Sequence, residues 1–221
     1  MPAPLPDGGR EWLDAECERV LVRGRWSKAD VWLARLPDGR RGVVKEFRGK
    51  PWPGRWWGRL QIAREARFLA FLSDLRVAPR LIARPHPLVL VMEALSGRPL
   101  YHCEGTPEGR AALEPLVQAV RRVHGAGVVH LDLRGRENVQ LERDGRVVLV
   151  DWASAVRLPP GTVRHRLFFG PLSRIDESAL VKWRQKLAPD TLTAEDRRLL
   201  RSFRFWRRLW PVKRRAGRRR G

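Results

Sequence analysis

The sequence predicts an α+β fold in two parts, an antiparallel sheet with one helix followed by a smaller, mainly helical part. Three observations predict it. Short β-rich runs recur within residues 18–47 and 79–95, and helical spacing dominates after them. A polar cluster, HLDLRGRENV at 130–139, then stands between two apolar stretches, where a buried core alone needs no such side chains.

The first part contains five expected strands. ERVLVRG, ADVWLARL and RGVVKEF lie within residues 18–47, and PDGR between the last two is typical of a tight hairpin turn. PRLIAR and PLVLVMEAL, within residues 79–95, have the same apolar, β-rich character. These runs predict an antiparallel meander extended to a five-stranded lobe that ends near Leu95.

One helix is expected within that lobe. A stretch rich in proline, glycine and tryptophan, residues 48–59, breaks the strand pattern, and helical spacing follows it over 60–75. The apolar residues that recur at this spacing are Ile62, Ala66, Leu69 and Leu72.

The second part begins with an amphipathic helix within residues 109–127, which ends at Gly125 and Gly127. The polar cluster comes next, and then an apolar strand that ends at Asp151. The chain is afterwards broken by proline, then helical, then strongly basic. We therefore divide it into residues 1–95, 96–198 and a basic segment, 199–221.

The composition excludes several classes of protein. Of the 221 residues, 43% are hydrophobic, which is enough for a folded core. The two cysteines, Cys17 and Cys103, lack the spacing of a zinc site and are too few for a disulfide framework, so a reducing compartment is expected. No apolar run approaches the roughly 18 residues of a membrane span, and the first residues lack the pattern of a signal peptide. We expect a cytoplasmic protein.

The net charge of +21 raises the question of an anionic partner. Arginines number 39 and lysines six, a skew that GC-rich coding alone can produce. A nucleic-acid-binding protein fits the charge and the tryptophans but leaves the polar cluster unexplained, so nucleic acid is not the partner we expect.

The order of the polar residues resembles that of the protein-kinase-like fold over residues 18–155. A lysine lies on the third strand, a glutamate on the helix, His-x-Asp and an asparagine after the second helix, and an aspartate at the end of a strand. These residues are Lys45, Glu65, Asp132, Asn138 and Asp151. The resemblance implies a two-lobed kinase-like fold with a five-stranded N-lobe and a reduced, mainly helical C-lobe.

By the same resemblance the cofactors are ATP and Mg²⁺. Lys45 would contact the α- and β-phosphates and be held by an ion pair with Glu65. Glu46 is the weaker candidate for this partner of Lys45. Asp132 would orient the attacking hydroxyl. Asn138 and Asp151 offer the hard oxygen ligands that Mg²⁺ prefers.

The catalytic loop departs from the family pattern, because five residues rather than four separate Asp132 from Asn138. Gly135 is expected to let the loop bulge. Because of this departure, Glu137 competes with Asn138 for the role of Mg²⁺ ligand. Either Arg134 or Arg136 would stand near the γ-phosphate and bind it in a bidentate manner.

Other roles implied by the resemblance are supported by fewer features of the sequence. Gly24 and Ser27 would cover the phosphates in a loop with few glycines, and the backbone of Met92, Glu93 and Leu95 would contact adenine. His130 is expected to hydrogen-bond the loop backbone rather than act as an acid or base. Asp176 is expected either to support that backbone or only to cap the start of a helix.

The short C-lobe is similar to that of small bacterial members of the superfamily, the lipopolysaccharide-core (Kdo and heptose) kinases and the RIO-like kinases among them. We favour phosphate transfer to a protein serine or threonine. A lipopolysaccharide sugar remains open as the acceptor, and so does a pseudokinase that acts as a binding scaffold.

The last segment has the pattern of an amphipathic helix with an aromatic face and a basic face, followed by a basic tail. It predicts peripheral contact with the anionic inner face of a membrane, with packing on the C-lobe as the alternative. The aromatic face holds Leu199, Phe203, Trp206 and Trp210, and the basic face holds Arg197, Arg201, Arg204 and Arg208.

Overall fold

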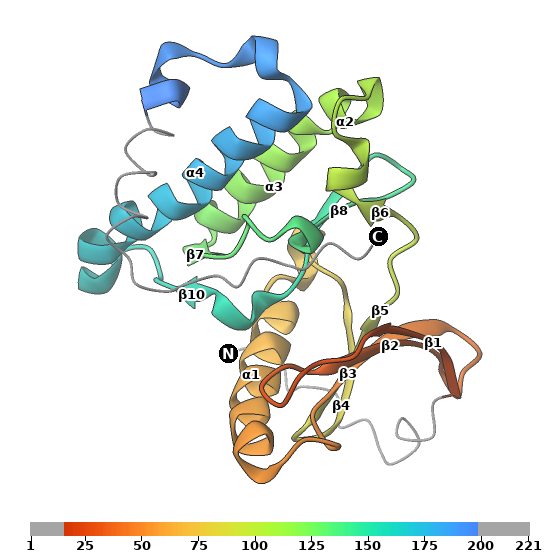
Figure 1. The fold of residues 1–221 in the computed structure, drawn as a ribbon. Coiled ribbons are helices and arrows are strands. Elements are labelled where there is room, and N and C mark those ends of the chain that lie inside the picture. Colours follow the sequence, from red (N-terminus) through yellow and green to blue (C-terminus); the bar gives the residue numbers. More distant parts are fainter. Residues whose placement is uncertain (1–15, 199–221) are drawn as a thin grey trace.

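Five antiparallel strands form one lobe of the protein, in the order β1-β2-β3-β5-β4. The computed structural model describes residues 16–198 (Figure 1). The segment 199–221, to which we assigned an amphipathic helix, lies outside the described residues. The strands are β1 (Glu16–Val22), β2 (Asp30–Arg35), β3 (Arg41–Glu46), β4 (Leu81–His86) and β5 (Val89–Glu93). The five-stranded antiparallel lobe expected from the sequence is thus confirmed.

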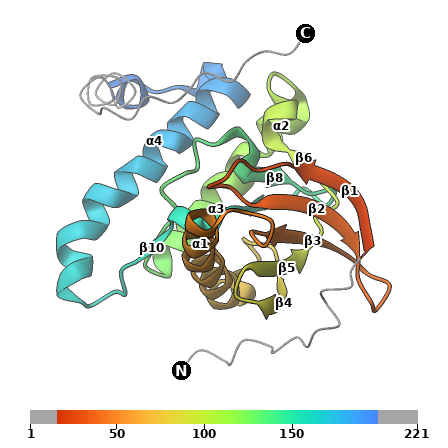
Figure 2. The same ribbon diagram turned by 60° about the horizontal axis from the view of Figure 1, so that its bottom comes forward.

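Helix α1 (Trp52–Phe71) lies against one face of this sheet (Figure 2). It begins within the stretch expected to precede it, because two glycines there allow close packing. A Cβ atom at Gly58 would lie 2.4 Å from the ring of Phe47, and one at Gly54 would lie 2.1 Å from the carbonyl oxygen of Trp26. Pro53 is tolerated in the first turn, where a helix has no partner for the missing N–H. After α1, the short helix η2 (Ser73–Leu75) leads to β4.

The second lobe is mainly helical, as expected. The single helix expected within 109–127 is two helices, α2 and α3, and α3 lies beside α4 in Figure 1. Two small sheets, β6-β8-β9 and β10-β7, carry the segments between the helices. The elements are β6 (Arg98–Pro99), η3 (Leu100–Cys103), α2 (Pro107–Ala111), α3 (Leu113–Gly125), β7 (Val128–Val129), η4 (Arg136–Asn138), β8 (Val139–Leu141), β9 (Val147–Leu149), η5 (Trp152–Ser154), β10 (Val156–Arg157), η6 (His165–Phe169), α4 (Gly170–Leu187) and η7 (Pro189–Thr191).

One hydrophobic core connects the two lobes. It contains Ile62 and Leu69 of α1, Leu116 of α3, and Leu133 from the polar cluster, all of them buried. Because the same core fixes α1 and the segment 130–138, the polar residues on both are held at a defined separation. Among the described residues, no helix is long and apolar enough to cross a membrane.

Candidate active site

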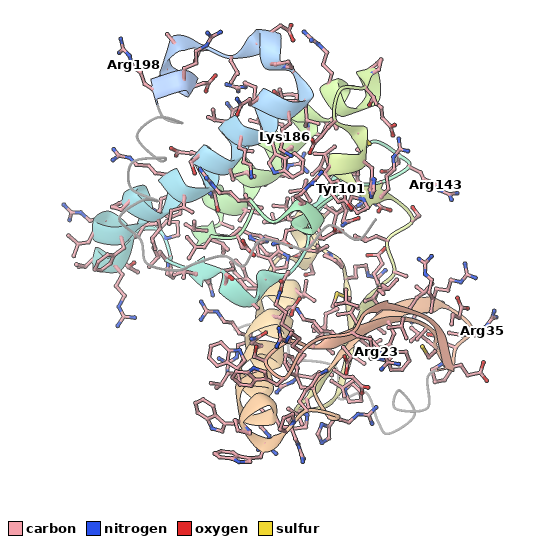
Figure 3. All side chains as sticks on the ribbon, in the orientation of Figure 1. Arg23, Arg35, Tyr101, Arg143, Lys186 and Arg198 are labelled. Atoms are coloured by element: carbon pink, nitrogen blue, oxygen red, sulfur yellow. The ribbon has the colours of Figure 1, made fainter. Side chains whose placement is uncertain are left out.

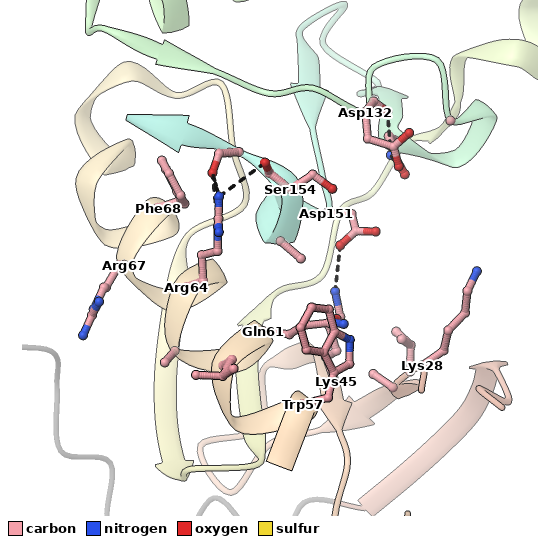
Figure 4. A pocket seen from close by; sticks show the side chains of 18 of the residues that line it. Lys28, Lys45, Trp57, Gln61, Arg64, Arg67, Phe68, Asp132, Asp151 and Ser154 are labelled. Atoms are coloured by element: carbon pink, nitrogen blue, oxygen red, sulfur yellow. Dashed lines mark hydrogen bonds and ion pairs between the residues drawn. The ribbon is translucent and has the colours of Figure 1, made fainter. Parts of the chain in front are cut away.

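The five polar residues singled out in the sequence meet in or beside one cleft, which has a volume of about 1550 Å³. Residues of both lobes line it (Figure 4). Lys45 comes from β3, Asp132 and Asn138 from the loop after β7, and Asp151 from the end of β9. Glu65 reaches the same place from α1, through a contact with Lys45.

Lys45 lies between two carboxylates. Its Nζ is 2.7 Å from Oε2 of Glu65 and 2.9 Å from Oδ1 of Asp151. Burial alone would lower the pKa of Lys45, but the two carboxylates outweigh it and raise that pKa. Burial, together with the charge of Asp151, raises the pKa of the Glu65 carboxyl against the opposing effect of Lys45. The lysine therefore stays charged in the cleft and is held in one position.

Asp151 turns its carboxylate into the cleft through an unusual backbone. Its φ and ψ of 65° and 66° lie in the left-handed region, which side chains other than glycine rarely adopt. Burial opposes ionisation, but the ammonium group of Lys45 lowers the pKa of Asp151. A negative charge is thus present in the cleft beside Lys45.

The loop after β7 is shaped by His130, which is fully buried. Its Nε2 is 3.1 Å from the carbonyl oxygen of Val150, and its Nδ1 accepts the N–H of Asp132 at 3.3 Å. Burial, only partly offset by Asp176, lowers the pKa of His130, so the ring is neutral near pH 7. These hydrogen bonds agree with the architectural role expected from the sequence.

Helix α4 holds the same loop through side-chain hydrogen bonds. The buried carboxylate of Asp176 accepts the backbone N–H groups of His130 and Leu131, at 2.8 and 2.9 Å, and lies 3.1 Å from Nε2 of His124. Trp183 Nε1 donates to the carbonyl oxygen of Leu133 at 3.0 Å. Asp176 lies inside α4 rather than at its start, so the alternative of a helix cap is wrong, and its carboxylate makes the hydrogen bonds to the loop backbone that the other expectation requires.

Asn138 reaches Asp132 in spite of the extra residue in the loop. Its Nδ2 donates to the backbone oxygen of Asp132 at 2.8 Å and to Oδ2 at 3.0 Å. Two successive turns absorb the added length, since Gly135 N–H donates to Asp132 and Asn138 N–H donates to Gly135. Gly135 has an ordinary φ of −61°, and its lack of a side chain matters because a Cβ would lie 2.6 Å from Nδ2 of Asn138.

The residues of the cleft fit a magnesium ion bound together with a nucleotide. Among the described residues, no three His, Cys, Asp or Glu side chains are grouped so as to hold an ion alone. Asp132, Asn138 and Asp151 instead offer two carboxylates and one amide in the lining of the cleft. Mg²⁺ is commonly held by one or two carboxylates together with phosphate oxygens, and this set is of that kind.

Several expected site residues lie away from the described lining of the cleft. Arg134 donates to Ser178 Oγ at 2.8 Å, on the side of α4, whereas Arg136 lines the cleft. Ser27 lines it too, but Gly24 does not, and the N–H of Gly24 donates to Asp30.

The residues expected to contact adenine are also outside that lining. Met92 is buried in the core, and the carboxylate of Glu93 accepts the N–H of Arg80 at 3.1 Å. Leu95 follows β5 and is half-buried.

Four basic residues that line the cleft were not singled out in the sequence: Lys28, Arg64, Arg67 and Arg157. Lys28, beside Ser27, lines the cleft and adds to the lowering of the pKa of Asp151. Its presence among only six lysines was the available indication. Arg64 of α1 donates from Nε to the carbonyl oxygen of Ala155 at 3.1 Å and so ties α1 to the segment after Asp151 (Figure 4).

Comparisons with known proteins found relatives that are named as kinases. No protein-family model matches the chain. Sperm motility kinase 3A of Mus musculus is 28% identical over 167 residues, which are 72% of this chain and 32% of that protein. Sperm motility kinase 2A of Mus musculus is 31% identical over 163 residues, which are 71% of this chain and 32% of that protein. The chain thus spans about a third of the length of these curated relatives.

Solved structures show the same fold. Rio2 kinase from Chaetomium thermophilum superimposes with a TM-score of 0.59 at 14% identity, over 80% of this chain and 60% of that chain. Its ADP/Mg²⁺-phosphoaspartate complex gives a TM-score of 0.58 at the same identity, over 80% and 58%. The chain therefore has the protein-kinase-like fold, as the order of its polar residues indicated.

Proposed function

We propose that the protein is an ATP- and Mg²⁺-dependent phosphotransferase whose acceptor is an alcohol, a protein serine or threonine in the first instance. One observation carries the proposal. The Lys45–Glu65 ion pair and Asp151 lie in contact, in the same cleft as Asp132 and Asn138. If the Lys45–Glu65 ion pair served only to stabilise the fold, the hydrogen-bonded Asp132–Asn138 pair would not have to lie in the same cleft.

The chemistry divides among these residues. Lys45, oriented by Glu65, would bind the α- and β-phosphates, and Asn138 and Asp151 would hold Mg²⁺, which would neutralise phosphate charge. The acceptor hydroxyl forms a bond to the γ-phosphorus while the bond to the bridging oxygen of ADP breaks. Asp132 orients the hydroxyl and takes its proton. Catalysis then consists mainly of positioning and charge neutralisation.

Further residues complete the proposed nucleotide site. Ser27 and Lys28 lie where the loop before β2 enters the cleft, and we assign them to the phosphates. Of the two arginines considered for the γ-phosphate, we choose Arg136 because it lines the cleft. Residues 1–95 and 96–198 are proposed as the two lobes, with adenine bound near the chain that joins them.

What the similar proteins are named, and what one of them binds, supports this proposal. The mouse relatives are kinases, and the Rio2 structure holds ADP and Mg²⁺ on the same fold. A RIO-like protein kinase in the cytoplasm is the form of the proposal that we favour. A lipopolysaccharide sugar as the acceptor and a catalytically inactive scaffold are the alternatives that an experiment has to separate.

That experiment is incubation of the purified protein with γ-labelled ATP and Mg²⁺, with a generic basic protein in one arm and a deep-rough lipopolysaccharide fraction in the other. We expect label in the basic protein or in the kinase itself. Label in the lipopolysaccharide alone would show that the sugar is the acceptor, and the proposal of phosphotransferase activity would stand. Absence of transfer and of ATP hydrolysis in both arms would favour the scaffold.

A further inference from the structure

A cluster of large apolar side chains lies exposed at the start of α1. We call it the tryptophan face, and its members and their exposed fractions are Trp26 59%, Trp52 80%, Trp56 62%, Trp57 46% and Leu60 50%. Tryptophan is on average strongly buried, and grouped exposed apolar side chains mark interaction surfaces. The fold alone gives no reason for this exposure.

Three members of the tryptophan face share one side of α1, and Trp26 lies on a loop packed against the first turn of the same helix. Trp52, Trp56 and Leu60 follow one another at intervals of four residues, so they share one side of α1. Trp26 comes from the loop before β2, and its carbonyl oxygen approaches Gly54 in the first turn of α1. That approach brings the two segments together.

A buried lysine fixes the loop in this position. Lys50 Nζ donates to the carbonyl oxygen of Gly24 at 2.8 Å and lies 2.8 Å from Oδ2 of Asp30. The loop that carries Trp26 is therefore tied to the residues directly before α1. The tryptophan face has a rigid base.

The exposed charged side chains of the two segments that carry this face are all basic. Residues 19–29 and 47–64 contain no aspartate or glutamate. Arg23, Arg25, Arg55 and Arg59 lie exposed among the tryptophans of these two segments. A partner of this surface therefore has to be anionic, which excludes the strongly basic segment 199–221 of the chain itself.

We propose that the tryptophan face docks on an anionic lipid bilayer. Indole rings favour the boundary between headgroups and acyl chains, and arginines beside them bind anionic headgroups. A single-stranded nucleic acid is the rival occupant, since its bases stack on aromatic rings. The lipid surface is favoured because Leu60, which shares one side of α1 with Trp52 and Trp56, offers aliphatic surface, on which bases do not stack.

Docking on this face would turn the cleft toward the lipid. Trp57 and Leu60 belong both to the tryptophan face and to the lining of the cleft, and Trp57 is labelled there in Figure 4. The proposal does not depend on catalysis, because binding to lipid is measured without ATP.

The test is co-sedimentation of the full chain with phosphatidylcholine vesicles, with and without phosphatidylglycerol. The apolar variant is Trp52→Ser/Trp56→Ser, and its matched control is Leu167→Ser/Phe168→Ser, which removes exposed apolar side chains of the other lobe. A second pair, measured in the same way, tests charge. Its variant is Arg55→Glu/Arg59→Glu, and its control is Arg121→Glu/Arg143→Glu, with Arg143 labelled on the far lobe in Figure 3.

We expect binding to anionic vesicles only. Both variants of the tryptophan face should bind about tenfold more weakly, which corresponds to about 1.4 kcal/mol, and both controls should bind like the unchanged chain. Equal binding by all five proteins would overturn the proposal, because another segment would then carry the contact.

Two further outcomes would also overturn it. One is equal losses in variants and controls, which would mean that net charge and total apolar surface decide binding. The other is that Trp52→Ser/Trp56→Ser weakens binding to a single-stranded oligonucleotide and not to vesicles. Thermal unfolding shows whether each protein is folded. If Trp52→Ser/Trp56→Ser is not folded, the comparison of Arg55→Glu/Arg59→Glu with its control decides the test alone.

Discussion

Replacing Asp176 by asparagine should destabilise the protein and slow its reaction more than any exposed acidic residue does. In the native structure the buried carboxylate accepts two backbone N–H groups of the loop that carries Asp132, at 2.8 and 2.9 Å. Asparagine keeps one acceptor oxygen and turns its NH₂ group toward the other backbone donor. One buried donor then has no acceptor, and the remaining hydrogen bond loses its charge.

The magnitude follows from these two losses. A buried donor without a partner costs about 1–3 kcal/mol, and a hydrogen bond to a charged group is worth about 1 kcal/mol more than a neutral one. We expect the free energy of unfolding to fall by about 2–4 kcal/mol. Turnover should fall as well, because the backbone next to Asp132 loses its support.

Urea unfolding followed by tryptophan fluorescence measures the first effect, and ATP turnover under folding conditions measures the second. Asp190→Asn is the matched control, since it removes an exposed carboxylate that pairs with Arg110 at 2.6 Å. An exposed ion pair is worth at most about 1 kcal/mol. If Asp176→Asn changed stability and turnover no more than this control, the loop-support role would be refuted.

Three further predictions concern the cleft and the loop. Lys45→Ala and Asp151→Asn should each lower phosphate transfer at least about a hundredfold with the fold intact, and near-normal turnover in both would contradict the site. Asn138→Ala should abolish activity and Glu137→Ala should not; the reverse result in the same assay would mean that Glu137 is the metal ligand. Burial lowers the pKa of His130 below its unfolded value of about 6.5, so its contribution to stability is complete above that pH and is lost as the pH falls through the lowered pKa. Melting temperatures of His130→Gln should therefore fall less on acidification than those of the unchanged chain, and parallel curves would argue against this cause.

The sequence was sufficient for the five strands of the N-lobe but not for the start of α1. Alternating apolar residues and the PDGR turn predicted β2 and β3 directly. The first turns of α1 were missed because proline and glycine usually interrupt a helix. Here Gly54 and Gly58 serve close packing against Trp26 and Phe47, a tertiary contact that no local pattern reveals.

The candidate site shows the same limit. The order of Lys45, Glu65 and Asp151 along the chain was enough to predict that they meet, and they do. The choice between Arg134 and Arg136 was not available from spacing, because neighbouring residues in a loop point in different directions. The direction is set by α4, whose Ser178 accepts the hydrogen bond of Arg134.

The account depends on Asp132 serving a reaction that consumes ATP, and this is most directly tested by measuring ADP formed from ATP, with and without Mg²⁺, in the unchanged chain and in Asp132→Asn. We expect ADP from the unchanged chain only with Mg²⁺, and about a hundredfold less from the variant, with nucleotide binding retained in both. Equal ADP formation by the two proteins, or formation that ignores Mg²⁺, would contradict the account.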